Sequence, residues 1–164
     1  MMPVGKLVFF CGKMAAGKST LARTLASEER AVLLVEDQFL ATLFPGEIVD
    51  LAGYVRCSSR IREALGRHIV QLLAMGVSVV LDFPANTRRQ RAWFRRLIED
   101  SGAAHELHFI DATDSLCLRQ LRDRSKDLPP DSRWSSDAEF HTVTAHFEPP
   151  ADDEGFNVIR HERG

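Results

Sequence analysis

A glycine-rich loop with a lysine and a hydroxyl near its end is the strongest chemical signal in this sequence. The segment GKMAAGKST, Gly12 to Thr20, satisfies the pattern GxxxxGK[ST], with an apolar run before it and the helical pattern LARTLA after it. Gly12 and Gly17 allow sharp turns, so that successive backbone N–H groups point at a phosphate beside the start of a helix. An ordinary glycine turn that carries a lysine by chance would not need this flanking strand and helix. The sequence therefore predicts a nucleoside triphosphate site.

Two side chains of this loop have specific expected roles. Lys18 can reach the β and γ phosphate oxygens, and the Ser19 hydroxyl can complete the octahedral shell of a Mg²⁺ ion. The expected nucleotide contacts are Gly12, Lys13, Met14, Ala15, Ala16, Gly17, Lys18, Ser19 and Thr20.

Two acids follow later apolar runs. Asp82 ends VSVVLD and can hold Mg²⁺ or its water, but Phe83 follows it where many hydrolytic ATPases place a glutamate base. Asp37 follows AVLLVE, and it can orient and deprotonate an acceptor hydroxyl if the carboxyl edges of the strands share one crevice. Asp37 can equally cap the following helix. Glu36 is less favoured because strand alternation directs it to the other face.

A cationic segment, LRQLRDRSK, precedes two prolines. Arginines there can stabilise the charge that spreads over the transferred phosphoryl group, and we expect Arg122 and Arg124 in this role. A solvated helix face accounts for some of these cations instead. We expect residues 113–136 to form a helix and a lid, with 126–134 as its loop and Arg133 as a weaker lid candidate.

A second arginine-rich segment, TRRQRAWFRR, raises the alternative of nucleic-acid binding. Arg88, Arg91 and Arg95 fall opposite the apolar stripe of a helix over 87–101, where a solvated face is expected, so nucleic acid is possible but not favoured. Asn86 and Arg88 are expected at the rim of the crevice as substrate contacts. Arg56 is a further substrate candidate, in the region between Phe39 and Ser58 where acceptor specificity is expected.

The elements that position these residues are short apolar runs that alternate with helical patterns. Five strands are expected, near residue 8 and over 31–35, 77–81, 106–110 and 156–159. A helix with its stripe from Ile61 stops at Gly76, and another runs from a Thr87 cap to Gly102. Such alternation predicts an α/β fold with a parallel sheet between two layers of helices, in one domain over 1–164.

Composition excludes several classes of protein. The chain has 164 residues, a formal net charge of −2 and 45% hydrophobic residues, which argues against a disordered or generally basic nucleic-acid-binding protein. Cys11, Cys57 and Cys117 lack a metal-binding spacing and suggest reduced thiols. No apolar stretch reaches the roughly 18 residues of a membrane span, so we expect a soluble cytoplasmic protein without membrane partners.

The absence of one sequence motif bears on which base the nucleotide carries. Guanine-specific GTPases carry an NKxD element that this sequence lacks, and the string DLAG at Asp50 to Gly53 only mimics a switch motif. Adenine is therefore the expected base.

The motifs together resemble a family, the small bacterial P-loop kinases that include zeta toxins, chloramphenicol phosphotransferase, gluconate kinase and the kinase domain of polynucleotide kinases. The resemblance rests on GKMAAGKSTLA, Asp37, LDFPANTRRQR, LRQLRDR and FEPPADDEGFNVI, which together span nearly the whole chain. It implies a P-loop NTPase sheet in the order 2-3-1-4-5, ATP as donor, Mg²⁺ as cofactor, Asp37 as base and Arg124 as a lid arginine. The sequence departs from the family where Gln120 replaces an arginine, where Ala15 replaces a glycine, and in a D-x-x-N spacing that is one residue longer.

We therefore expect an ATP-dependent kinase that transfers the γ-phosphate to a hydroxyl of a small molecule. Two alternatives remain open at this point. One is a 5′-polynucleotide kinase, and the other is a nucleotide-binding switch or ATPase without a phosphate acceptor. The sequence indicates neither the acceptor nor an oligomeric state.

Overall fold

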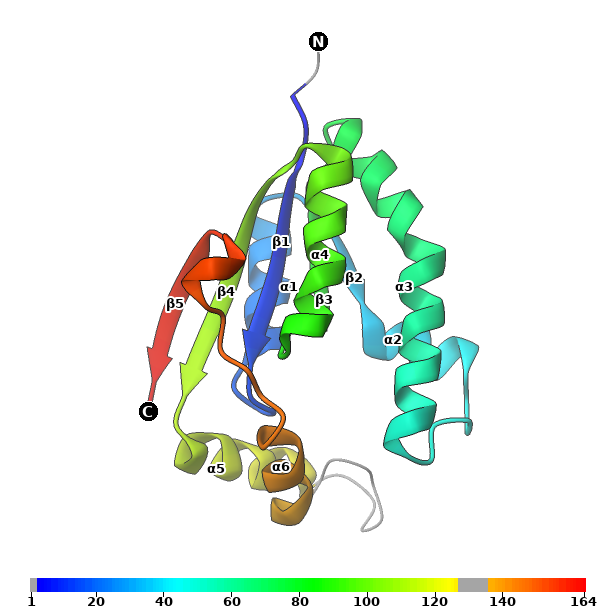
Figure 1. Cartoon of the computed structure of the whole chain (residues 1–164). Helices are drawn as coiled ribbons and strands as arrows, with labels where there is room; N and C mark the ends of the chain where they lie inside the picture. The colour runs from blue at the N-terminus through cyan, green and yellow to red at the C-terminus, as the bar shows by residue number, and fades with distance from the viewer. Residues whose placement is uncertain (1–2, 127–135) are drawn as a thin grey trace.

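The computed structural model describes residues 3–126 and 136–164 (Figure 1). The strands are β1 Lys6–Gly12, β2 Val32–Val35, β3 Val79–Pro84, β4 Ala104–Ala112 and β5 Val158–Arg163. The helices are α1 Lys18–Glu28, α2 Glu36–Leu43, α3 Leu51–Ala74, α4 Arg88–Ser101, α5 Asp114–Ser125 and α6 Asp137–Thr144, with a short 3₁₀ turn, η1, at Asp152–Glu154. Within the described ranges, no helix is long and apolar enough to cross a membrane.

All five strands are parallel and lie in the order β2-β3-β1-β4-β5, which confirms the expected fold. The central strand β1 is apolar on both faces because both faces are covered by helices. Leu7 and Phe9 belong to the core formed with α3 and α4, whereas Val8 and Phe10 pack against α1. Figure 1 shows α1 behind the sheet and α4 in front of it, with α3 beside α4.

Helix α3 begins ten residues before the stripe that predicted it. Its first turn is capped by Asp50, whose carboxylate accepts a hydrogen bond of 2.7 Å from the Gly53 N–H. The string DLAG is therefore a helix start, in agreement with its interpretation as a chance match to a switch motif. The expected stops at Gly76 and Gly102 are also present, each with positive φ.

The last strand was expected over 156–159 but lies at Val158–Arg163. Phe156 instead packs edge-on against Phe9 of β1, with ring centroids 5.5 Å apart. The strand continues through the polar residues after Ile159 because backbone pairing with β4, rather than an apolar pattern, sustains an edge strand.

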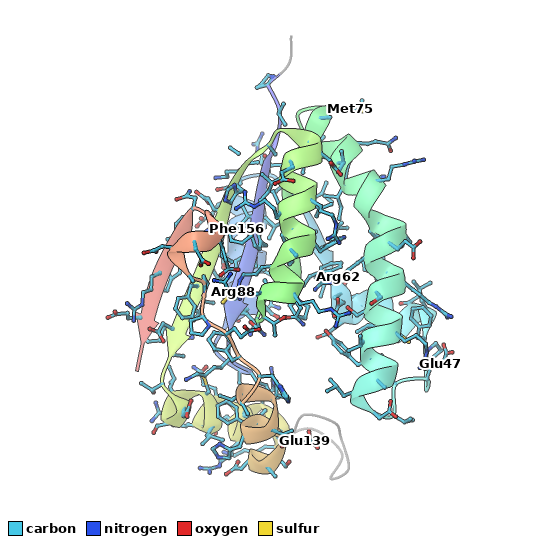
Figure 2. All side chains as sticks on the ribbon, in the orientation of Figure 1. Glu47, Arg62, Met75, Arg88, Glu139 and Phe156 are labelled. Atoms are coloured by element: carbon cyan, nitrogen blue, oxygen red, sulfur yellow. The ribbon has the colours of Figure 1, made fainter. Side chains whose placement is uncertain are left out.

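The expectation of a solvated arginine face on α4 is wrong for Arg91. This side chain is fully buried, and its guanidinium pairs with the Glu154 carboxylate at 2.7 Å and donates to the Ala85 carbonyl at 2.9 Å. Arg95 lies over the Phe156 ring, and Arg88 pairs with Asp153. Figure 2 labels Arg88 and Phe156 near this part of α4. These arginines are paired because the C-terminal segment that contains η1 crosses this face of α4 and supplies acidic partners.

The expected lid is only partly visible. Helix α5 ends at Ser125, and α6 begins at Asp137. The proline-containing part of the lid and its candidate Arg133 lie outside the described residues.

Candidate active site

The phosphate-binding loop connects β1 to the first turn of α1, as its motif predicts. Gly17 precedes the helix with a φ of 110°, a conformation that favours glycine. Ala15 adopts a left-handed conformation with a φ of 61°. The residue that replaces the family's glycine therefore keeps a glycine-like backbone, at a cost of about 1 kcal/mol.

Lys18 lies folded against the loop. Its ammonium donates hydrogen bonds to the Gly12 carbonyl and, at 2.9 Å, to the Lys13 carbonyl. Burial lowers the pKa of Lys18 to about 8, and the attraction of Asp82 opposes this shift. A phosphate at the loop would provide the negative charge that this desolvated ammonium lacks.

Three side chains hold the backbone of the phosphate loop by hydrogen bonds. The Asn86 carbonyl oxygen accepts a hydrogen bond of 2.9 Å from the Gly12 N–H, and Arg163 donates to the Ala16 carbonyl at 2.7 Å. In the amide orientation that gives both groups a partner, Gln120 donates to the Ala15 carbonyl at 2.6 Å and accepts from Arg163 at 3.2 Å. Arg163 could not be predicted from a local pattern, because it lies 147 residues from Ala16 along the chain.

The two predicted acids lie at the carboxyl ends of neighbouring strands. Val35 of β2 pairs with Asp82 of β3, and Asp37 follows in the first turn of α2. Asp37 is exposed to the cleft, yet partial withdrawal of its carboxyl from water and repulsion by Asp82 raise its pKa, while Arg124 and Lys18 oppose the rise. The helix is capped by Val35 without a side-chain bond, so capping is not the role of Asp37.

The structure thus brings Lys18, Asp37, Asp82 and Arg124 within electrostatic range of one another. Ser19 and Asp82 offer hydroxyl and carboxylate oxygens, which are the donors that Mg²⁺ prefers, and phosphates and waters usually complete its shell. Within the part of the chain that the structure describes, no group of three or more His, Cys, Asp or Glu side chains could hold a metal ion. The Ser19 hydroxyl and the Asp82 carboxylate therefore fit a Mg²⁺ ion whose other ligands would be phosphate oxygens and waters.

Other predicted residues have different surroundings. Arg122 forms an ion pair of 2.5 Å with Asp137 of α6, and Arg88 is bound to Asp153. Arg56 is exposed on α3 and, like Arg88, is not part of the cleft lining. Their roles toward phosphate or substrate stay predictions.

A cleft of about 1490 Å³ extends from the phosphate loop to the space between α3 and α4. Met14, Lys18 and Asp37 lie in its lining at the loop, together with Asn86 at the end of β3. Figure 2 labels Arg62 between α3 and α4, where the cleft continues. One continuous space therefore joins the expected nucleotide and acceptor positions.

A buried polar cluster lies at the end of the cleft between α3 and α4, and it was not predicted from the sequence. Glu36 is 1% exposed, and it accepts hydrogen bonds from the Tyr54 hydroxyl at 2.5 Å and the Ser58 hydroxyl at 2.8 Å. Arg62 lies 3.7 Å from the same carboxylate. Burial raises the pKa of Glu36, and these partners oppose the rise. Tyr54, Ser58 and Arg62 recur every four residues on α3, and this polar stripe is the signal that could have revealed them.

The cysteine beside the loop does not belong to the site chemistry. Cys11 is fully buried in β1, and burial raises the pKa of its thiol to about 12. It is therefore an unreactive core residue.

Residues 7–150 match the AAA_33 family, described as an AAA domain. This chain belongs to that family. The match includes the phosphate loop, both candidate acids and α5, so it confirms the P-loop domain and its capacity for nucleotide binding as a family property. No curated protein sequence matches the chain.

Solved structures share the fold at low sequence identity. A putative kinase from Chloroflexus aurantiacus superposes with a TM-score of 0.74 and 19% identity, covering 97% of this chain and 88% of its own. The Mycobacterium tuberculosis APS kinase CysC, in complex with AMPPNP and APS, has a TM-score of 0.64 and 19% identity, with coverage of 98% and 89%. A gluconokinase from Sinorhizobium meliloti has a TM-score of 0.60 and 18% identity, with coverage of 98% and 84%. The expected resemblance to small P-loop kinases is confirmed at the level of the fold.

Proposed function

We propose that this protein is an ATP-dependent kinase that transfers the γ-phosphate of Mg·ATP to a hydroxyl of a small molecule. The observation that carries the proposal is the continuity of the cleft, whose lining includes both Lys18 and Asp37 and continues between α3 and α4. A nucleotide-binding switch needs no enclosed second space beside its phosphate site. The APS kinase and gluconokinase folds support the same class of reaction.

In the proposed phosphoryl transfer, some residues would stabilise negative charge and others would position the acceptor. The loop N–H groups and Lys18 would hold the phosphates, and Arg124 would lie over the transferred group, where negative charge spreads in the transition state. Asp37 would accept the proton of the acceptor hydroxyl and hold its oxygen in line. Mg²⁺, held by Ser19 with Asp82 in support, would neutralise phosphate charge when bound.

The raised pKa of Asp37 fits this role, because a more basic carboxylate accepts a proton more readily. Phe83 follows Asp82 and is buried, so no glutamate stands there to activate water. The three cysteines, all free and buried, are compatible with the reducing cytoplasm in which we place this enzyme.

The polynucleotide kinase alternative has lost its main support. Arg91 and Arg95 of α4 are bound to the segment around Glu154, and Arg88 pairs with Asp153. A basic face that is already paired offers fewer cations to a phosphodiester backbone.

The test compares wild type with Asp37→Asn. A fluorescent ATP analogue measures nucleotide affinity, and γ-labelled Mg·ATP measures transfer to pooled metabolites and, separately, to 5′-hydroxyl oligonucleotides. We expect Asp37→Asn to bind the analogue like wild type and to lose transfer by about 10²-fold or more. Asp152→Asn, an exposed acid outside the cleft lining, is the matched control and should behave like wild type. Equal transfer by Asp37→Asn and wild type would overturn the assignment of the base.

A further inference from the structure

The cleft between α3 and α4 has an unusual inner wall, because its polar side chains are bound to one another. Tyr54 and Ser58 line the cleft, and both donate their hydroxyl hydrogens to the buried Glu36 carboxylate. These hydrogens are therefore not available to a ligand.

Arg62 is committed in the same way. Its guanidinium donates to the Pro84 carbonyl at 2.6 Å and to the Gln90 carbonyl at 3.3 Å, and it lies 4.8 Å from the centroid of the Trp93 ring. The pair with Glu36 occupies its remaining edge. An arginine held on three sides and only 9% exposed is a structural cation, not an open anion site.

The wall nearest the phosphate loop follows the same rule. The Asn86 side-chain Oδ1 accepts from the Gly12 N–H, the backbone N–H of Asn86 donates to the Gln90 side-chain oxygen at 2.8 Å, and the backbone N–H of Gln90 donates to the Thr87 hydroxyl at 3.1 Å. These hydrogen bonds tie the three residues to the phosphate loop and to one another.

The rest of the wall between α3 and α4 is mostly, though not wholly, apolar. Val55 and Val70 of α3, Trp93 and Leu97 of α4, and Phe147 all belong to its lining. Gly66 lies opposite Trp93, where an added Cβ would be 3.7 Å from the indole nitrogen. Apart from the buried Arg62, the charged lining residues of α3 and α4 are exposed to solvent: Glu63, Arg67, Arg89, Arg96 and Asp100.

We infer that the phosphate acceptor is a hydroxyl-bearing molecule with an apolar or ring-shaped body, rather than a sugar, sugar acid or other polyol. A buried polyol needs a hydrogen-bond partner for nearly every hydroxyl, and an unpaired one costs about 1–3 kcal/mol. An apolar body gains from contact with the apolar part of this lining while its hydroxyl reaches Asp37. This inference rests on the proposed function, because it assigns the acceptor half of the same cleft.

The binding test uses N-phenyl-1-naphthylamine, a neutral probe that becomes fluorescent in apolar sites. Val55 lines the cleft and is 48% exposed, so Val55→Asp adds a charge to the wall without disturbing the core. Val158 is 40% exposed on β5 and outside the cleft lining, which makes Val158→Asp the matched control. We expect probe affinity to fall about tenfold with Val55→Asp and to stay at the wild-type value with Val158→Asp.

A second cleft variant guards against misfolding. Leu51 is exposed at the first position of α3, where an aspartate is favoured by the helix N-terminus. Leu51→Asp should therefore fold and still weaken the probe. Absence of probe binding to wild type, or equal binding by wild type and both cleft variants, would overturn the inference.

A transfer experiment separates this inference from the proposed function. With γ-labelled Mg·ATP, 2-phenylethanol and cyclohexylmethanol should accept phosphate faster than glucose, gluconate or glycerol. Preference for a polyol would overturn the inference and leave the kinase assignment standing. If no alcohol is labelled while the probe binds in the cleft, the apolar site stands and the kinase assignment fails.

Discussion

The two ends of the cleft are built on opposite principles. At the phosphate end, one continuous segment from Gly12 to Thr20 carries the loop backbone together with Lys18 and Ser19. At the end that we propose for the acceptor, Tyr54 and Ser58 of α3 bind Glu36 of α2, Arg62 packs on Trp93 of α4, and the wall is mostly apolar. The first end is specified by local sequence and can be read from it, whereas the second exists only when three helices are packed together.

Glu36 and Asp37 show the same contrast within two adjacent residues. Glu36 is buried and holds three side chains of α3, while Asp37 is exposed to the cleft and is close to Lys18 and Arg124. Strand β2 ends at Val35, and the chain turns directly into a helix, so the two carboxylates diverge. In the proposed reaction, Glu36 would organise the acceptor end and Asp37 would act on the acceptor.

The largest effect is expected at the phosphate end. Lys18→Met should lower phosphate transfer by about 10³-fold, because the charge on the phosphates loses its partner in a desolvated site. Stability should hold or rise, since a buried ammonium is replaced by an apolar chain of similar length. Labelled transfer and thermal unfolding measure the two effects, and a variant with unchanged transfer would contradict the role of the loop lysine.

The next largest effect separates the adjacent acids. Glu36→Gln should cost about 2–3 kcal/mol of stability because it leaves Arg62 buried without its carboxylate. Asp37→Asn should change stability by less than about 0.5 kcal/mol. Urea unfolding of both variants tests this contrast, and similar losses would show that the two carboxylates do not have separate roles.

Nucleotide affinity should depend on pH through Lys18. In the ligand-free protein the pKa of this residue is lowered to about 8, and nearby phosphates would raise it in the complex. Binding then takes up a proton, so affinity is greatest below pH 8 and falls by up to about tenfold per pH unit above it. Calorimetry in two buffers of different ionisation enthalpy measures this uptake. Uptake that persists unchanged in Lys18→Met would assign the proton to another group.

The smallest expected effects are the changes in stability when a glycine at each end of the cleft is replaced by alanine. Gly17→Ala should cost about 1–2 kcal/mol and weaken nucleotide binding, because φ is 110° and the new Cβ would lie 2.5 Å from the Arg163 guanidinium. Gly66→Ala should instead stabilise α3 by about 0.5–1 kcal/mol, since its Cβ meets only ordinary contacts. Chemical denaturation measures both, and effects of the same sign would show that the two ends do not differ in this way.

The sequence was informative where a signal is local. The alternation of apolar runs predicted the parallel sheet, and the loop motif with Asp37 and Asp82 predicted the residues that the structure brings together. The burial of Arg91 could not be foreseen from the period of α4, because its partner Glu154 lies 63 residues later on a segment that crosses the helix. Glu36 was set aside on strand alternation, which ceases to apply once the strand ends at Val35.

The most direct test of the account is the fate of the γ-phosphate. Wild-type protein with γ-labelled Mg·ATP would be incubated with a metabolite extract and, separately, with 5′-hydroxyl oligonucleotides, and the products separated by reversed-phase chromatography. The account predicts a labelled, retained compound from the extract, absent with Asp37→Asn, and no labelled oligonucleotide. Label found only as free phosphate, or only on oligonucleotide ends, would contradict a small-molecule kinase with an apolar acceptor site.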